Sequence, residues 1–243
     1  MEVKNFDARG GDPSWALSRT RTAMVWGLGL TAACGLLFVY FPELDLIVSR
    51  FFYRDSGAGA PSGFTLASSS ALYFFFKGVD VVSRIVLIAV IGFTIFFLWK
   101  KSNKFLPAIV ITFSLVLGPV LLVNGVFKDH WDRARPRELI EFGGSKKFTP
   151  AWIISDQCNR NCSFTSGHAA AGFSFVVGHF VAASRIWIWL GLIVGSFTGL
   201  TRIAVGAHFL SDVVFSFFAV YLVAALVTYG AIRIAELRKA SSA

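Results

Sequence analysis

The chain has 243 residues, of which 55% are hydrophobic and 15% are charged, and its mean hydropathy is +0.65. Soluble globular proteins are about 45–50% apolar and about 25% charged, so this composition excludes an ordinary soluble domain, a collagen-like repeat and a disordered chain. The net charge is nevertheless +9, with 23 Lys and Arg residues against 14 Asp and Glu residues. The distribution of this positive charge along a hydrophobic chain indicates how the protein is arranged.

Six segments are apolar and long enough to be membrane-spanning helices, which need roughly 20 residues to cross a hydrocarbon core about 30 Å thick. The second is the least regular, because it reaches spanning length only if residues 81–83 join it. In chain order the predicted spans are Thr22–Pro42, Ile85–Trp99, Phe105–Phe127, Asn161–Ser184, Ile186–Thr201 and Val213–Ile232, the last with a helix that begins near His208. We therefore predict an all-α, polytopic membrane protein, a six-transmembrane-helix bundle in a single membrane-embedded domain over residues 1–243.

The Lys and Arg residues in the connections indicate which face of the bundle is cytoplasmic. Eleven of them, including Lys4 and Arg9, precede the first span, follow the sixth, or lie in the second-to-third and fourth-to-fifth connections. The other twelve lie on the opposite side, and seven of those fall within residues 128–160. The count alone does not decide the orientation, but seven basic residues in one long loop are typical of a site, whereas the short connections follow the positive-inside rule. We therefore expect the first side, with both termini, to be cytoplasmic. The first span is too long for a signal peptide, so we expect it to stay in the membrane.

The first external loop, Glu43–Arg84, combines two kinds of sequence. Residues 55–63 contain three Gly and one Pro, which predicts a flexible, turn-rich stretch. The aromatic segment Phe64–Phe76 follows. It fits either a helix that lies in the membrane interface or an extension of the second span, and the sequence leaves both open.

Three short stretches concentrate polar residues at the external ends of the predicted spans. They are Lys128–Pro136 after the third span, Thr165–His168 at the start of the fourth, and Thr201–Asp212 between the fifth and sixth. Alternating spans bring all three stretches to the same face of the membrane. We therefore expect them to form one site.

The first group of side chains in these stretches suits a phosphate dianion. Lys128, Arg135 and Arg202 supply three cations with many N–H donors, and Arg adds planar, bidentate recognition of phosphate oxygens. Ser166 and Gly167 precede a helix whose first backbone N–H groups are unpaired and point at an anion. We expect these five residues to bind phosphate, with the missing side chain of Gly167 allowing close approach.

The second group suits nucleophilic and acid–base chemistry. His208 and Asp212 are four residues apart, so they share a face of a helix, and a carboxylate there can bond one imidazole nitrogen and leave the other as a nucleophile. His168 can give a proton to a leaving oxygen. Taken singly, a Lys or Arg at a span end is usually an interfacial anchor and a lone His is usually structural. The joint arrangement, with an Asp inside a membrane helix, argues for a site.

These stretches resemble the signature of the type 2 phosphatidic acid phosphatase superfamily. That signature is Lys, six residues, Arg-Pro; then Pro-Ser-Gly-His; then Ser-Arg, five residues, His, three residues, Asp. The positions that match, block by block, are Lys128, Arg135 and Pro136; Ser166, Gly167 and His168; and Arg202, His208 and Asp212. Thr165 and Thr201 stand where the family usually has Pro and Ser. We expect Thr165 to cap the helix instead, and activity to be kept.

The resemblance implies a metal-independent phosphatase without a cofactor. In that family His208 would attack phosphorus to form a phosphohistidine, Asp212 would orient it, and His168 would protonate the leaving alkoxide. Lys128, Arg135 and Arg202 would hold the phosphoryl oxygens. The expected partners are the bilayer and a phosphorylated membrane lipid rather than a nucleic acid. The expected location is the bacterial inner membrane, with the site facing the periplasm.

Several lipid phosphates fit a site at this interface, among them lipid A, phosphatidic acid, phosphatidylglycerol phosphate and undecaprenyl pyrophosphate. Lipid A is favoured, because the long insertion Glu138–Asn161 carries Lys146 and Lys147, which suit a polyanionic head group. Its position of hydrolysis, 1 or 4′, stays open. Cys158 and Cys162 in the same loop are either a disulfide, as an oxidising periplasm would allow, or two free thiols. Their spacing, without a third ligand nearby in the sequence, argues against a zinc site.

Three other functions compete with a lipid phosphatase. A lipid phosphotransferase would pass the phosphoryl group to a second lipid instead of water. A transporter or scramblase would use buried charges as a substrate path, but it is expected to have helix breaks at mid-membrane, whereas these charges gather at one face. A vanadate-dependent haloperoxidase resembles the same signature, but six spans argue against a soluble enzyme.

Overall fold

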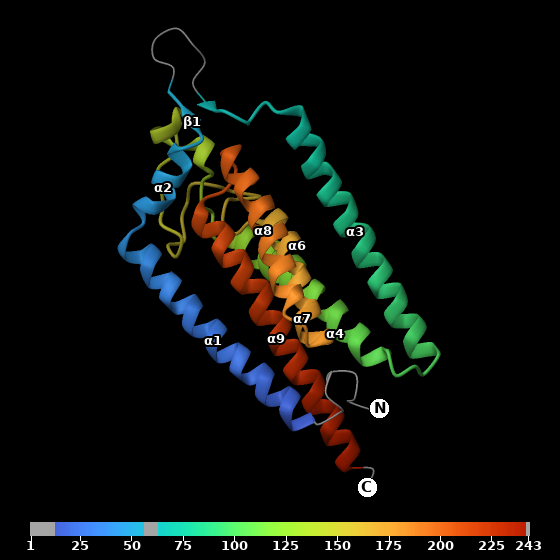
Figure 1. The fold of residues 1–243 in the computed structure, drawn as a ribbon. Helices are drawn as coiled ribbons and strands as arrows, with labels where there is room; N and C mark the ends of the chain where they lie inside the picture. Colours follow the sequence, from blue (N-terminus) through green and yellow to red (C-terminus); the bar gives the residue numbers. More distant parts are fainter. Residues whose placement is uncertain (1–12, 56–62, 242–243) are drawn as a thin grey trace.

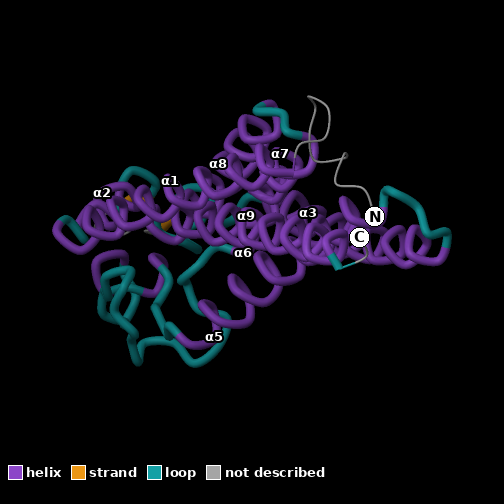
Figure 2. The backbone as a smooth tube through the Cα atoms, turned by 90° about the horizontal axis from the view of Figure 1, so that it is seen from below, coloured by secondary structure: helices purple, strands orange, loops and turns teal. Residues whose placement is uncertain are grey.

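The chain, as a computed structural model, is described for residues 13–55 and 63–241 and is almost entirely helical (Figures 1 and 2). Lys4, Arg9 and most of the Gly-rich stretch after Asp55 lie outside the described residues. The long helices are α1 (Pro13–Tyr40), α3 (Ser70–Trp99), α4 (Phe105–Leu115) with its π-helical continuation η2 (Val116–Phe127), α8 (Ile186–Ala204) and α9 (Leu210–Ala240). A shorter, three-part helix consists of α6 (Gly167–Phe173), η5 (Ser174–Val176) and α7 (Val177–Ala182).

Short elements gather at one end of the bundle. They are α2 (Glu43–Arg50), the two-residue strands β1 (Tyr53–Arg54) and β2 (Gly63–Phe64), α5 (Lys128–His130), η3 (Pro136–Glu138) and η4 (Ile140–Phe142). The strands form an antiparallel pair in which Tyr53 faces Phe64. Their aromatic rings pack against Phe142, so this hairpin is joined to the loop between α5 and α6. Most of that loop lies beside α5 in Figure 2.

The all-α membrane class is confirmed. In the described part of the chain, five helices are long and apolar enough to cross a membrane: Ser14–Tyr40, Ser70–Trp99, Phe105–His130, Ile186–Ala204 and Leu210–Ala240. The predicted fourth span is present as the shorter apolar helix Gly167–Ala182. It begins later than predicted because residues 161–166 are non-helical and belong to the external loop.

The sequence predicts a start of the second span at Ile85, which is later than the start in the structure. The structure starts α3 at Ser70, where the hydroxyl of Ser69 accepts a hydrogen bond from the backbone N–H of Leu72. Such a cap satisfies one of the unpaired N–H groups of a helix start. From Ser70 onwards the aromatic segment is thus an extension of the second span rather than a separate helix, whereas residues 64–69 belong to β2 and a turn. The amphipathic helix α2, which the sequence analysis did not predict, occupies the first external loop instead.

Close packing of two helices fixes the position of the external loop. A Cβ atom on Gly172 of α6 would lie 2.7 Å from the Cα of Gly195 on α8, so the two backbones touch. Small residues permit such approach between membrane helices. The contact sets the start of α6, with Ser166 and His168, beside the last turn of α8, which carries Arg202.

Helix α3 is the exception to this close packing. None of its residues is buried, and it stands apart from the other helices in Figure 1. Hydroxyls of Thr94 and Thr112 join it to α4 at 2.8 Å, and Phe75 contacts Phe197 of α8 near its other end. Between these contacts an apolar groove of about 500 Å³ separates α3 from α4, α6 and α7.

Candidate active site

The three polar stretches meet at the end of the bundle that carries α2 and the hairpin. Alternating helices bring them there: the bundle runs up and down, and the first residues of α1 lie at the same end as the last residues of α9, opposite the site (Figure 1). The topology predicted from the sequence therefore places the predicted site residues on one face. Their contacts show which of them actually meet.

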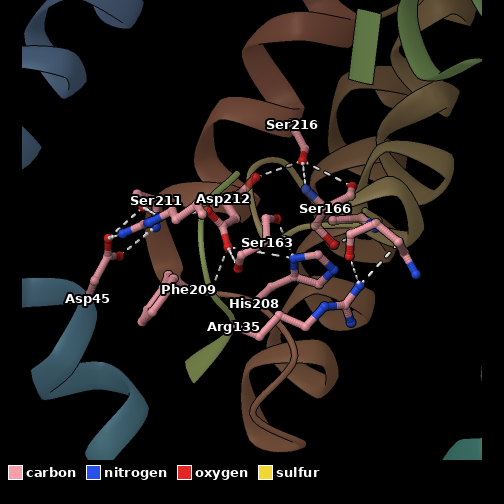
Figure 3. A network of polar contacts seen from close by, with 12 residues as sticks. Asp45, Arg135, Ser163, Ser166, His208, Phe209, Ser211, Asp212 and Ser216 are labelled. Carbon is pink, nitrogen blue, oxygen red and sulfur yellow. Dashed lines mark hydrogen bonds and ion pairs between the residues drawn. The ribbon is translucent and has the colours of Figure 1, made fainter. Parts of the chain in front are cut away.

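The turn between α8 and α9 presents His208. Gly206 ends the helical segment with φ +66, a left-handed conformation that favours glycine, and a Cβ there would overlap the ring of Phe64. His208 then lies fully buried two residues before α9. Its Nδ1 is 2.8 Å from the carbonyl oxygen of Ser163, shown in Figure 3. A carbonyl only accepts, so Nδ1 carries the proton and Nε2 carries a lone pair.

The surroundings of His208 keep its ring neutral. Burial lowers the pKa of His208 well below the usual value of 6.5, and the nearby charges of Arg202, Arg135 and Lys128 act in the same direction. The hydrogen bond to Ser163 acts in the opposite direction but is the weaker influence. A neutral imidazole with a free lone pair on Nε2 is the nucleophilic form of histidine.

Asp212 supports His208 less directly than its spacing predicts. Its Oδ2 lies 3.6 Å from His208 Nδ1, a distance of an ion pair rather than of a hydrogen bond. The same carboxylate accepts hydrogen bonds from the hydroxyl of Ser163 at 2.5 Å and the backbone N–H of Phe209 at 2.8 Å. Asp212 thus holds Ser163, and the carbonyl of Ser163 holds the imidazole.

His168 is the second histidine of the site, one residue into α6. Its Nε2 lies 3.3 Å from Asp80 Oδ1 of α3, within ion-pair distance but without hydrogen-bond geometry. Its ring packs edge-on against Phe76, also of α3, with centroids 5.3 Å apart. The helix that stands apart from the bundle therefore supplies two of the side chains around this histidine.

The three predicted phosphate-binding cations also lie here. The guanidinium of Arg202 sits 4.5 Å above the ring of Phe76. Arg135 donates from one nitrogen to the backbone carbonyl of Asn161 at 2.7 Å and to its side-chain oxygen at 3.1 Å. Lys128 begins α5 and is partly buried. Burial lowers the pKa of Arg135, and the charge of Arg137 adds to this. Burial is the main cause of the lowered pKa of His208, and the charges of these three cations add to it.

Ser166 caps α6, and Thr165 does not. The Ser166 hydroxyl accepts a hydrogen bond from the N–H of Ala169, whereas the buried Thr165 hydroxyl has no hydrogen-bond partner in the described structure. The expected Thr165 cap is therefore wrong. A Cβ on Gly167 would meet the side-chain amide of Asn124 on η2, so a larger residue there would have to displace that side chain.

Four residues that the sequence analysis did not assign complete the surroundings. Arg133 lies inside the first polar stretch and is fully buried, and Ser163 lies two residues before the second. Asp80 is an acidic residue in an apolar helix, which is an available signal of function. Asp45 in α2 gives no such signal, because acidic residues are common in the first turn of a helix.

The loop between α5 and α6 is fastened by a disulfide. Cys158 and Cys162 are bonded, one of the two states that the sequence left open. They flank Asn161, which accepts the hydrogen bonds of Arg135. Of the two lysines expected to meet a head group, Lys146 pairs with Glu138 at 3.1 Å, whereas Lys147 is exposed.

Unpaired polar atoms mark the centre of the site. Among buried side-chain atoms without a hydrogen-bond partner in the described residues are Nε2 of His208, Nε2 of His168 and Nε of Arg202. Buried polar groups are nearly always hydrogen-bonded, so such atoms call for an explanation such as catalysis. The three atoms come from the second and third polar stretches.

Comparisons with known proteins agree with this arrangement. The sequence model of the PAP2 superfamily matches residues 107–234. The chain is 34% identical over 210 residues to a protein of Francisella tularensis subsp. novicida named lipid A 4′-phosphatase, covering 83% of this chain and 92% of that protein. It is 30% identical to a protein of the same name from Rhizobium leguminosarum, covering 73% and 83% of the two chains.

A third protein of that name, from Rhizobium etli, is 42% identical over a shorter stretch, which covers 41% of this chain and 40% of that protein. No solved structure matches the chain significantly. The family match covers all three polar stretches and more than half of the chain. This protein is therefore a member of the PAP2 superfamily.

Proposed function

We propose that this protein hydrolyses the 4′-phosphate monoester of lipid A through a phosphohistidine on His208 at the periplasmic face of the bacterial inner membrane. The coarser activity, a membrane-lipid phosphatase, follows from the family and from its relatives. The observation that carries the finer proposal is the state of His208. Its Nδ1 donates to the carbonyl oxygen of Ser163, and its buried Nε2 has no hydrogen-bond partner among the residues that the structure describes and lies near three cations.

In the first step, Nε2 of His208 attacks phosphorus and the bond from phosphorus to the lipid oxygen breaks. Protonated His168 gives a proton to the departing alkoxide and becomes neutral, so the leaving lipid is released as an alcohol. Lys128, Arg135 and Arg202 stabilise the charge on the phosphoryl oxygens, which is the main requirement of phosphoryl transfer. The phosphorylated imidazole keeps its Nδ1 proton and is cationic beside Asp212.

In the second step, neutral His168 takes a proton from water as the water oxygen attacks phosphorus. The bond from phosphorus to Nε2 breaks, phosphate leaves, and both histidines return to their starting states. No metal is required, because the cations supply the charge that a metal would otherwise provide. In the described residues, no three His, Cys, Asp or Glu side chains gather into a group that suits a metal.

The apolar groove favours a lipid as substrate. It is lined by Val82 on α3 and Ala171 on α6, which follow Asp80 and His168 by two and three residues. It continues to Val181 on α7 and Trp187 on α8, near the opposite end of the bundle. A phosphorylated head group at the site therefore has an apolar path below it, along which hydrocarbon chains lie at membrane depth. The names of the three relatives favour lipid A and its 4′-phosphate.

Phosphate release from purified lipid phosphates tests the proposal. The panel contains lipid A labelled at the 1- or the 4′-phosphate, phosphatidic acid, phosphatidylglycerol phosphate and undecaprenyl pyrophosphate. Wild type should release inorganic phosphate from the 4′ position, and His208→Ala should reduce the rate by about a thousandfold or more. His130→Ala is the matched control, since this histidine is exposed and its Nδ1 lies 2.9 Å from the backbone carbonyl oxygen of Val126 on the preceding turn.

Each other result has a defined meaning. If no lipid in the panel releases phosphate, the proposed phosphatase activity is contradicted. Label that appears in a second lipid instead of in free phosphate indicates the phosphotransferase. Full activity of His208→Ala contradicts the assignment of His208 as the nucleophile.

A further inference from the structure

A buried arginine lies between two carboxylates directly behind the site. The guanidinium of Arg133 is fully buried and contacts Asp45 Oδ2 at 2.8 Å through one terminal nitrogen and Asp212 Oδ1 at 2.7 Å through the other. Its Nε donates to the carbonyl of Thr149 at 2.8 Å, and its flat face lies 4.1 Å from the ring of Phe209. The guanidinium of Arg133 is thus fixed by polar contacts at all three of its nitrogens and by the ring of Phe209 on its face.

Asp45 reaches this place from the external helix α2, which the family signature does not include. Its Oδ1 accepts the backbone N–H of Ser211 at 2.8 Å, and its Oδ2 accepts the hydroxyl of Ser211 at 2.6 Å (Figure 3). Ser211 is the second residue of α9, and the residue before α9 is Phe209, which has no side-chain oxygen. Asp45 therefore acts as the N-terminal cap of α9 from a distant part of the chain.

The charge state of Asp45 follows from its partners. Burial raises the pKa of the Asp45 carboxyl above its usual value and the nearby charge of Asp212 adds to this, whereas the charge and hydrogen bond of Arg133 and the hydrogen bond of Ser211 oppose the shift. The hydrogen-bond geometry decides in favour of the carboxylate. A carboxylate accepts from all three donors at once, which a protonated carboxyl does less well. The buried set of Asp45, Arg133 and Asp212 then carries a net charge of −1.

This net charge matters at His208. On the side of the phosphate, His208 faces Arg202, Arg135 and Lys128, and all three disfavour positive charge on the ring. On its Nδ1 side it faces Asp212 at 3.6 Å. If Arg133 were paired with Asp212 alone, the pair would be neutral and would not stabilise a cationic phosphohistidine. A second carboxylate on Arg133 restores the negative charge.

We propose that Asp45 is a positioning residue of the phosphatase: it shares Arg133 with Asp212, so that a net negative charge lies behind His208, and it fixes the first turn of α9. The inference rests on the proposed function, because it concerns the cationic intermediate formed on His208. It adds a residue outside the three polar stretches to the machinery of the reaction.

Charge-balanced variants test this role. Asp45→Asn keeps the shape of the side chain and makes the buried set neutral, so kcat should fall by roughly tenfold to a hundredfold while KM changes little. Adding Arg133→Gln returns the set to −1, and kcat should recover in part. Asp45→Glu, the conservative change, should also retain more activity than Asp45→Asn. Glu43→Gln on the exposed face of α2 is the matched control and should equal wild type.

The outcomes separate this role from a purely structural one. A double variant no more active than Asp45→Asn overturns the proposal, as does a change in KM without a change in kcat. The double variant also covers the case in which Asp45→Asn alone does not fold, because recovery of folded, active enzyme on adding Arg133→Gln supports the charge account. If wild type releases no phosphate from any lipid, the proposed function fails; if wild type is active and Asp45→Asn equals it, only this inference fails.

Discussion

The chemistry of the site depends on which nitrogen of His208 carries the proton. The Ser163 carbonyl at 2.8 Å requires a proton on Nδ1, so a neutral ring has its lone pair on the buried Nε2. Asp212 acts one contact further away, through the hydroxyl of Ser163. The backbone carbonyl of Ser163 thus sets the tautomer of His208, and the carboxylate of Asp212 holds Ser163 in place.

This arrangement predicts that His208 stays neutral in mildly acidic solution. Its pKa lies well below 6.5, chiefly because of burial, so the ring should not bind a proton as the pH falls from 7.5 to 5.5. NMR of the detergent-solubilised protein with labelled histidine should show one ring, absent in His208→Ala, whose shifts do not change over that range. A His208 ring that titrates near 6.5 would contradict the buried, neutral nucleophile.

At the residue scale the sequence predicts the identities of the charged side chains better than their contacts. The four-residue spacing correctly places Asp212 beside His208, but it cannot show that Ser163 lies between them, because that contact joins positions 45 residues apart in the chain. Thr165 was expected to cap α6, and the cap is its neighbour Ser166. No local sequence pattern could predict the contacts of Asp45, because its partner Ser211 is 166 positions away in the chain.

At the scale of elements, α3 differs from the other long helices because it is held near its ends. The Thr94–Thr112 contact holds it to α4, and Phe76 and Asp80 hold it to His168. The groove lies between these contacts. In a membrane such a groove is filled by hydrocarbon, so we expect chains of the substrate to pack there during turnover.

Substitution in the wall of the groove should therefore separate lipid substrates by chain length. Leu87 lines the groove, whereas its neighbour Ile88 is 70% exposed and is not part of the wall. Leu87→Trp should lower kcat/KM for a long-chain lipid phosphate by about tenfold, the loss of one to two kcal/mol of apolar contact. The same variant should leave hydrolysis of a short-chain, water-soluble phosphate monoester unchanged, because that substrate does not use the groove.

Ile88→Trp is the matched control and should behave as wild type with both substrates. Equal effects of Leu87→Trp on the two substrates would show that the groove serves folding rather than substrate binding. No effect on either would assign the groove to bulk membrane lipid.

Element boundaries could be predicted only where charge marks them. The fifth span begins at Ile186 as expected, because Arg185 precedes it. The fourth was expected from Asn161, but residues 161–166 are drawn out of the helix by contacts to distant residues, such as that of Ser163 with Asp212. The π-helical course of η2, with Pro119 inside it, has no periodic signal that hydropathy would detect.

At the scale of the whole molecule, the net charge of +9 divides between the two ends of the bundle. The α3–α4 connection and the last turns of α9, which carry basic residues, lie at one end of the bundle (Figure 1). Lys128, Arg133, Arg135 and Arg202 belong to the site at the other end. The first group fits the cytoplasmic anchoring expected from the positive-inside rule. The second surrounds the site, where Arg133 is shared by the carboxylates of Asp45 and Asp212 and the other three face His208.

The most direct test of the whole account is to locate the phosphoryl group on the enzyme. Wild-type protein mixed with lipid A labelled in its 4′-phosphate, and quenched in alkali within one turnover, should yield a peptide with phosphate on a nitrogen of His208. His208→Ala should yield none, and His168→Ala should accumulate the labelled intermediate if the first step is slowed less than the second. Phosphate on any other residue, or turnover without a labelled enzyme under conditions that preserve phosphohistidine, would contradict the mechanism.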